Sequence, residues 1–326
     1  MESALTRTSV WLHRYAIFTA GATLLLILAG GLVTSTGSGL AVPDWPLAFG
    51  MVFPPMVGGV LFEHGHRMIA TFVGMLTVVL AVWIWKSEGR RWLRYLGLAA
   101  LAAVVVQGLL GGITVLYLLP TAVSVTHACL AQIFFCLTVS IALFTSRGWQ
   151  DPASLVEDGG SVPLRGLTIL ASATVFLQLL LGAIMRHMGA GLAIPDFPLS
   201  FGHIFPPLDG LPLGPEEGAL VTRSQVLVHF AHRSWSVIVL AAIVWVVSQI
   251  SRRHPGRRTV AGPARLLLGL VIAQVAVGAH VIWSGKAVVV TTVHVATGAS
   301  ILATSVVLCL QTWRLLVPPS LGGDGR

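Results

Sequence analysis

Residues 39–55 read GLAVPDWPLAFGMVFPP, and residues 191–207 read GLAIPDFPLSFGHIFPP. Twelve of these 17 positions are identical, at a constant offset of 152 residues. A chain that repeats itself in this way is interpreted first as two copies of one structural unit. The duplication predicts an N-terminal half over residues 1–145 and a C-terminal half over residues 164–326. The polar segment 146–163, rich in Gly, Ser, Asp and Pro, is the expected linker.

The composition excludes an ordinary soluble domain. Hydrophobic residues make up 55% of the chain and charged residues 10%, and the mean hydropathy is +0.86. Apolar stretches near the roughly 20 residues needed to cross a bilayer recur eight times. We therefore predict an all-α polytopic membrane protein with transmembrane helices at 12–34, 64–85, 95–118, 122–145, 165–186, 225–250, 265–284 and 288–313.

Each copy of the repeat supplies four of these helices. An even number of crossings gives both halves the same orientation, so they are expected to be related by a pseudo-twofold axis along the membrane normal. The predicted architecture is two tandem four-helix bundles side by side, with sites inside each bundle.

The net charge of +8 is a topology signal. If the N-terminus is cytoplasmic, the inner segments hold fifteen of the 20 basic residues, and basic loops remain on that side during insertion. Both termini are therefore expected inside, in a bacterial plasma membrane, since no Arg- and Ser-rich transit segment precedes the first apolar stretch. Membrane lipid is an expected partner and nucleic acid is not. The fifteen residues are Arg7, Arg14, Lys86, Arg90, Arg91, Arg94, Arg147, Arg165, Arg252, Arg253, Arg257, Arg258, Arg265, Arg314 and Arg326.

Three cysteines, Cys129, Cys136 and Cys309, fall inside predicted helices. Cys129 and Cys136 are separated by about 10 Å along one helix, which is too far for a disulfide. We interpret all three as small apolar side chains.

Four histidines occupy matching places in the two halves. His66 corresponds to His232 and His127 to His294, at offsets of 166 and 167 residues. Each falls in the first two turns of a predicted helix that starts on the outer side, so all four lie at similar depth. A histidine in a membrane helix can simply hydrogen-bond a neighbour. Four ionisable groups at equal depth, two in each bundle, instead indicate a function.

Two imidazoles facing each other across an apolar bundle suit a b-type haem with both axial positions filled. Zinc would require further ligands that the sequence does not offer in either bundle. Arg67 and Arg233 directly follow His66 and His232. They are candidates for contacts to haem propionates, with snorkelling to the interface as the alternative.

The two halves differ at one telling position. The first half reads Glu63-His64-Gly65-His66-Arg67, whereas the second has His229 in the place of Glu63. Glu63 and His66 are three residues apart and project from one helix face. The carboxylate can complement the helix dipole or pair with Arg67. Alternatively, the first half performs chemistry while the second only holds a cofactor.

At this point the sequence resembles the haem A synthases over nearly its whole length. The resemblance is carried by ExxHR at Glu63, His66 and Arg67, by HxxHR at His229, His232 and Arg233, by the single histidines His127 and His294, and by the repeated loop. It implies oxidation of the C8 methyl of haem O to a formyl group, through successive hydroxylations. It assigns His66 and His127 to the substrate haem O and His232 and His294 to a resident haem B, with Glu63 beside the reacting methyl.

The resemblance also implies partners: a haem O synthase and the assembly of cytochrome oxidase. A homo-oligomer is left open. Some bacterial members carry a cysteine pair in the first outer loop, and this chain has none between residues 35 and 62, so thiol-based electron delivery is in doubt here. His187, His203 and His280 have no histidine counterpart in the first half, and loop or rim structure is the favoured interpretation. The electron acceptor and the source of oxygen do not follow from the sequence.

Two other classes of protein share some of these sequence features. A di-haem b-type electron-transfer protein would also use four histidines, but it would normally place its haems near opposite membrane faces. Here all four histidines fall toward the outer side. A transporter built by duplication would suit parallel repeats, yet its helices would be broken near the middle of the membrane, where polar residues would gather. Neither feature is evident in the sequence.

Overall fold

The computed structural model describes residues 8–151, 153–208 and 221–317. Each predicted apolar stretch forms one continuous helix, because a lipid-facing backbone must satisfy its polar groups internally. Eight helices are long and apolar enough to cross a membrane, so the predicted number is confirmed for the described residues. They are α1 (Val10–Ser35), α2 (Gly59–Ser87), α3 (Arg91–Leu116), α4 (Thr121–Thr145), α6 (Leu164–His187), α7 (Arg223–Arg253), α8 (Arg258–Trp283) and α9 (Val288–Leu315).

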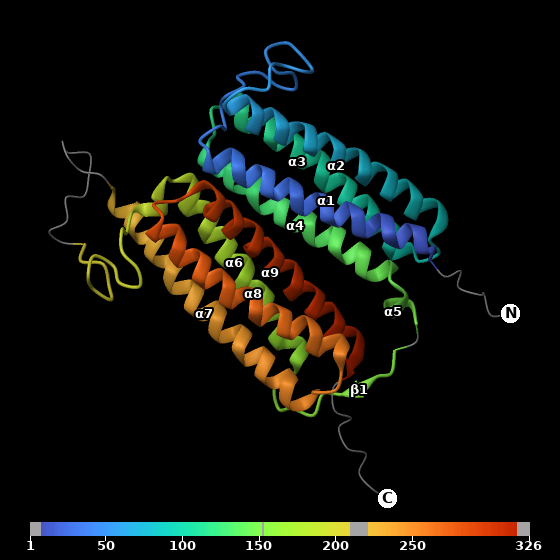
Figure 1. Cartoon of the computed structure of the whole chain (residues 1–326). Helices are drawn as coiled ribbons and strands as arrows, with labels where there is room; N and C mark the ends of the chain where they lie inside the picture. The colour runs from blue at the N-terminus through green and yellow to red at the C-terminus, as the bar shows by residue number, and fades with distance from the viewer. Residues whose placement is uncertain (1–7, 152, 209–220, 318–326) are drawn as a thin grey trace, which may run out of the picture.

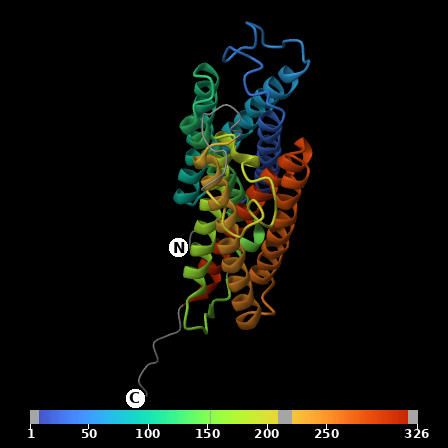
Figure 2. The same ribbon diagram turned by 90° about the vertical axis from the view of Figure 1, so that its left-hand side faces the viewer.

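The helices pack as two rings of four. In the first half each helix contacts the next, and α1 also contacts α4; in the second half α6, α7, α8 and α9 pair in the same order. The halves meet through α1, α4, α6 and α9, as the two groups lying side by side in Figure 1 show. Figure 2 shows that the helices of both halves run along a common long axis. The pseudo-twofold axis itself stays a prediction.

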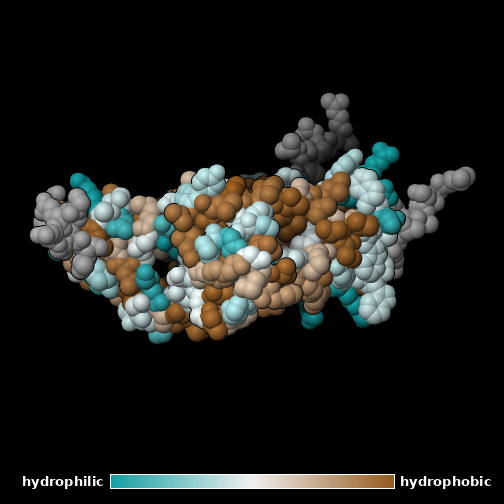
Figure 3. Space-filling model, turned by 90° about the horizontal axis from the view of Figure 1, so that it is seen from above, coloured by the Kyte–Doolittle hydropathy of each residue, from teal (hydrophilic) through white to brown (hydrophobic). Residues whose placement is uncertain are grey.

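The outward faces of the helices are apolar. Phe72, Trp85, Ile238, Trp245 and Ile272 are all exposed although each lies within a long helix. Apolar side chains cover much of the middle of the face seen in Figure 3, and hydrophilic residues gather toward both ends. This distribution is that of a multi-pass membrane protein, in which lipid takes the place of water around the middle of the helices.

The buried apolar core of each half lies toward one end of its bundle. In the first half it includes Leu12 at the start of α1 and Ile84 at the end of α2. In the second half it includes Leu164 at the start of α6 and Leu308 late in α9. Both cores therefore lie at the end where α1 and α6 begin, which leaves the opposite end, where the two long loops lie, for polar groups.

The linker between the halves is more ordered than its composition predicts. It contains a short helix, α5 (Arg147–Gln150), and a two-residue strand, β1 (Val156–Glu157), which pairs in parallel with β2 (Leu316–Val317). Asp158 is buried, accepts a hydrogen bond from the backbone N–H of Leu164 (2.6 Å) and pairs with Arg253 (3.0 Å). Tertiary contacts thus fix the linker against both the start of α6 and the end of α7.

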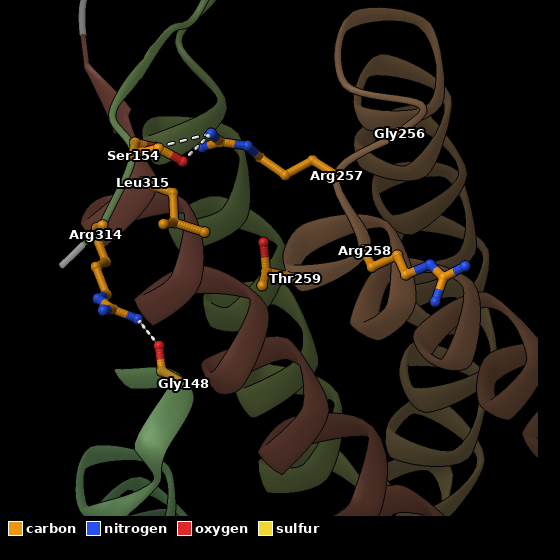
Figure 4. A pocket seen from close by; sticks show the side chains of 9 residues that line it. Gly148, Ser154, Gly256, Arg257, Arg258, Thr259, Arg314 and Leu315 are labelled. Atoms are coloured by element: carbon orange, nitrogen blue, oxygen red, sulfur yellow. Dashed lines mark hydrogen bonds between the residues drawn. The ribbon is translucent and has the colours of Figure 1, made fainter. Parts of the chain in front are cut away.

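A cavity lies at this same end of the molecule and is lined by residues of the linker, the α7–α8 turn, α8 and α9 (Figure 4). Arg257 donates to the carbonyl (2.8 Å) and the hydroxyl (3.0 Å) of Ser154, and Arg314 donates to the carbonyl of Gly148 (2.6 Å). These arginines, predicted as cytoplasmic topology signals, also hold the linker against the second half. The cavity includes none of the four paired histidines.

Candidate functional site

The two copies of the repeated loop fold alike around an aspartate. The Asp44 carboxylate accepts hydrogen bonds from the backbone N–H groups of Phe49 (2.7 Å) and Gly50 (2.9 Å). Asp196 binds Phe201 (2.7 Å) and Gly202 (2.8 Å) in the same way. The hydrogen bonds from Gly50 and Phe49 hold the pKa of the Asp44 carboxyl below its usual range. Both aspartates therefore act as turn residues.

An arginine of the following helix donates hydrogen bonds to the backbone of each loop. Arg67 donates through Nη1 to the carbonyls of Asp44 (2.7 Å) and Leu47 (2.9 Å). Arg233 donates to the carbonyls of Leu199 (3.0 Å) and Ile194 (3.3 Å). The loops are therefore docked on the mouths of their bundles. His64 adds a contact that the sequence analysis did not assign, because its Nε2 lies 2.9 Å from the carbonyl oxygen of Val52.

Glu63 is buried and links the loop to Arg67. Its Oε2 accepts from the backbone N–H of Val42 (2.9 Å), and its Oε1 accepts from Nη2 of Arg67 (2.7 Å). Glu63 is thus a partner of Arg67, which is one of the two structural roles that the sequence allows for it.

His229 makes the same two contacts in the second half. The backbone nitrogen of Ile194 lies 3.2 Å from its Nδ1, and Nε of Arg233 lies 3.1 Å from its Nε2. A neutral imidazole accepts at only one of its two nitrogens, so only one of these contacts is a hydrogen bond at a time. Ile194 is the repeat counterpart of Val42, at the offset of 152 residues. An imidazole therefore occupies the place of the Glu63 carboxylate between the loop amide and the arginine, but it can accept only one of the two hydrogen bonds. The difference that remains at this position of the repeat is the carboxylate.

The four paired histidines lie above the apolar cores. His66 lies in α2, His127 in α4, His232 in α7 and His294 in α9. In each of these helices the bundle core begins seven residues further on, at Val73, Phe134, Val239 and Ile301. Seven residues correspond to about 10 Å along a helix, so all four imidazoles lie at the same height above the cores.

Two of these histidines lie deeper in their helices than predicted. His66 and His232 fall in the third helical turn, because α2 begins at Gly59 and α7 at Arg223, before the apolar stretches themselves begin. In α7 the early start is stabilised by a capping box between Thr222 and Gln225.

The assignment of the four histidines as two ligand pairs stays a prediction, although the members of each pair lie near one another. His66 and His127 are close enough to interact electrostatically, and so are His232 and His294. Each imidazole also packs on a glycine of the preceding helix. A Cβ added to Gly30, Gly111, Gly182 or Gly278 would lie 3.1, 3.3, 2.9 or 3.1 Å from Cε1 of His66, His127, His232 or His294, respectively.

The donor set fits a haem held by two axial imidazoles. The Nδ1 atoms of His66, His127 and His294 are buried and have no hydrogen-bond partner among the described residues. A histidine that binds a metal through Nε2 keeps its proton on Nδ1. Among the described residues, no three His, Cys, Asp or Glu side chains gather as a metal site. Pairs of imidazoles suit a macrocycle that supplies the other four ligands itself.

The remaining histidines stand outside these pairs. His187 is the last residue of α6 and lies near His127 across the two halves. His203 is exposed in a β-bridge with Ser200, and His280 lies in the last turn of α8. The three cysteines are unpaired, as predicted.

Sequence analysis missed the glycines and the glutamines that accompany them. Gln107, Gln178 and Gln274 each precede a histidine-packing glycine by four residues. A search for Gln-x-x-x-Gly in both halves would have found them. The signal was not used because glycine is common in membrane helices and only the fold shows which glycines face a ring.

Substitution of Gly182 by alanine is expected to disturb the site of the second half. The new Cβ would lie 2.9 Å from Cε1 of His232, closer than real Cβ contacts, so the ring or helix must shift. Overpacking of this kind costs about 1–3 kcal/mol. Haem content and the low-spin absorption spectrum of the purified variant measure the effect. Gly166→Ala on the same helix is the control, because nothing lies within 4 Å of its added Cβ. Equal spectra for the two variants would contradict the prediction.

Comparison with known proteins identifies a family and several relatives. Residues 57–306 match the sequence model of the COX15-CtaA family, described as cytochrome oxidase assembly protein. The chain is 28% identical over 283 residues to a protein of Halalkalibacterium halodurans named heme A synthase, covering 83% of this chain and 87% of the relative. Proteins of the same name from Symbiobacterium thermophilum (31% over 270 residues; 78% and 80% covered) and Sphingopyxis alaskensis (29% over 331 residues; 90% and 88% covered) are also similar.

Proposed function

The chain belongs to the COX15-CtaA family of cytochrome oxidase assembly proteins, and from this premise we propose that it is a haem A synthase. It is an oxidoreductase that converts the C8 methyl of haem O into the formyl group of haem A. Support comes from relatives named heme A synthase that match most of its length. They favour this activity over the alternative of a di-haem electron-transfer protein.

We assign the substrate haem O to His66 and His127, and a resident haem B to His232 and His294. The observation that carries this assignment is the exchange of Glu63 for His229 at one position of the repeat. Both side chains lie between the loop amide and the arginine, and the second loop keeps its fold with an imidazole there, so the loop does not require a carboxylate. A charge retained only in the first half is best explained by the reaction.

Glu63 is the proposed catalytic residue. Oxidation of a methyl group removes hydrogen, develops positive charge and releases protons. A buried carboxylate can stabilise that charge and accept a proton. Its two hydrogen bonds, from Val42 and Arg67, fix the direction of the carboxylate oxygens before the substrate binds. The resident haem, when bound, supplies an iron centre capable of one-electron transfer.

Arg67 and Arg233 remain proposed contacts to haem propionates. Their guanidinium groups already donate to loop carbonyls at the outer end of each bundle. A propionate bound there would compete for the same donors and would therefore couple haem binding to the loop. Charge-assisted bonds from arginine to a carboxylate are stronger than bonds to a neutral carbonyl.

The proposed setting is a bacterial plasma membrane with both ends of the chain on the cytoplasmic side. In that orientation the histidine pairs lie near the outer side of the membrane, and the arginine-rich ends of α7, α8 and α9 lie on the cytoplasmic side. The proposed partners are a haem O synthase, which makes the substrate, and the cytochrome oxidase that receives haem A.

Co-expression with a haem O-producing enzyme tests the proposed function. Chromatography of the haems extracted from the purified chain is expected to give haem B together with haem O or haem A. A chain that carries haem B alone, with haem O available in the same membrane, would refute the synthase. A colourless protein would refute both haem-based functions.

A further inference from the structure

Three of the four histidine segments are held to the preceding helix by a glutamine. The side-chain amide of Gln107 donates to the backbone carbonyl of His127 (2.9 Å). Gln178 donates to the carbonyl of His232, and Gln274 to that of His294, both at 3.0 Å. In a membrane such a bond pins one helix to another at the height of the imidazole.

In the second half the glutamines also reach the rings. The amide nitrogen of Gln178 lies 3.2 Å from Nδ1 and 3.3 Å from Nε2 of His232. The amide nitrogen of Gln274 lies 3.5 Å from Nε2 of His294. Because Nε2 is the nitrogen assigned to the iron, the contacts to it do not persist with haem bound, and the bond from each glutamine to the backbone carbonyl is the restraint that remains.

The helix that precedes His66 breaks the pattern. Leu26 stands four residues before Gly30, and at the offset of 152 residues it is the counterpart of Gln178. Its side chain packs against the apolar core of the first half. A leucine donates no hydrogen bond, and no other side chain of the described residues donates to the carbonyl of His66. The α1–α2 contact is thus the one place where the repeat lacks this restraint.

We propose that Gln107, Gln178 and Gln274 are positioning residues for three haem ligands, and that Leu26 leaves the His66 segment free to release its ligand. This inference rests on the proposed function, in which the first site must exchange haem O for haem A and the second must keep its haem. One hydrogen bond between membrane helices changes an equilibrium about threefold on average and up to roughly 20-fold. A difference of that size is sufficient to make one site the faster to exchange.

The reciprocal substitutions Leu26→Gln and Gln178→Leu test the proposal. Iron protoporphyrin IX serves as the probe in the full chain in detergent, and an excess of a haem-binding apoprotein traps what dissociates. A His232→Ala background reports the first site alone, and a His66→Ala background reports the second. We expect the first site to release the probe faster. Leu26→Gln should slow that release about threefold to 20-fold, and Gln178→Leu should accelerate release from the second site by a similar factor.

Two further measurements separate positioning from a general effect on folding. The low-spin spectrum of bis-imidazole ligation should persist in both variants, and release from the unaltered site of each should not change. Leu26→Met controls for a change of shape without an added amide and should exchange as the parent does. If Gln178→Leu fails to fold, the Leu26→Gln comparison still decides.

Unchanged release after Leu26→Gln would overturn the inference, as would equal release from the two sites of the parent. A chain that exchanges in the expected order but forms no haem A would keep the inference and overturn the proposed function. A chain in which neither histidine pair binds the probe would overturn both.

Discussion

Replacement of His66 by alanine is expected to stop haem A formation while the second site keeps its haem. The variant loses one axial ligand of the proposed substrate iron, so haem O is no longer held with its methyl beside Glu63. His232 and His294 belong to a separate ring of helices and retain their contacts with Gly182 and Gly278. The purified protein should therefore carry roughly one haem B per chain with a bis-imidazole spectrum.

Two further variants provide the comparison: the converse substitution in the second site, and a substitution of a histidine that lies outside both sites. His232→Ala should lose the resident haem B and keep the ability to bind haem at His66 and His127. His203→Ala, in an exposed loop bridge, should behave as the parent. Pigment analysis and the yield of haem A from the co-expressing strain measure all three. Loss of both haems on replacing His66 alone would contradict the division into two independent sites.

Replacement of Glu63 is expected to separate structure from chemistry. Glu63→Gln removes the charge and should lower haem A formation at least about a hundredfold, since a positioned acid–base group contributes about 10²–10⁴-fold. The amide oxygen can still accept from Arg67, while the NH2 group no longer accepts from Val42. The loop should remain docked because Arg67 also donates to its carbonyls. Haem content should therefore be unchanged, and extracted haem O should accumulate in the place of haem A.

The second half of the molecule provides a sharper variant. Glu63→His gives the first bundle the residue that stands at this position of the second. There His229 lies beside the corresponding loop amide and arginine. It should fold and load haem as the parent does, yet remain inactive for want of a carboxylate. Arg67→Gln, by contrast, should loosen the loop, because Arg67 donates to three loop carbonyls. Normal turnover by a stable Glu63→His protein would remove Glu63 from the reaction and leave it as a loop anchor.

Much of the fold follows from hydropathy. Eight apolar stretches became eight helices, because a backbone in lipid has few alternatives to the helix. The ends of the helices were less predictable. Helices α2 and α7 begin at Gly59 and Arg223, before the predicted starts at residues 64 and 225, and neither a glycine nor an arginine carries a signal of apolar character. The order within the linker was also missed, since the pairing of β1 with β2 joins residues that are distant in the sequence.

The sequence by itself determined the duplication and the number of helices, and it predicts which histidines belong together, because each leaves a mark that a period or an offset can detect. Tertiary structure decided what surrounds them. Only packing shows that Glu63 and His229 contact corresponding amides of the two loops, that each imidazole rests on a glycine, and that Leu26 stands where Gln178 binds a histidine carbonyl. Such contacts join different helices, and apolar sequences that satisfy hydropathy equally well do not specify which faces of those helices meet.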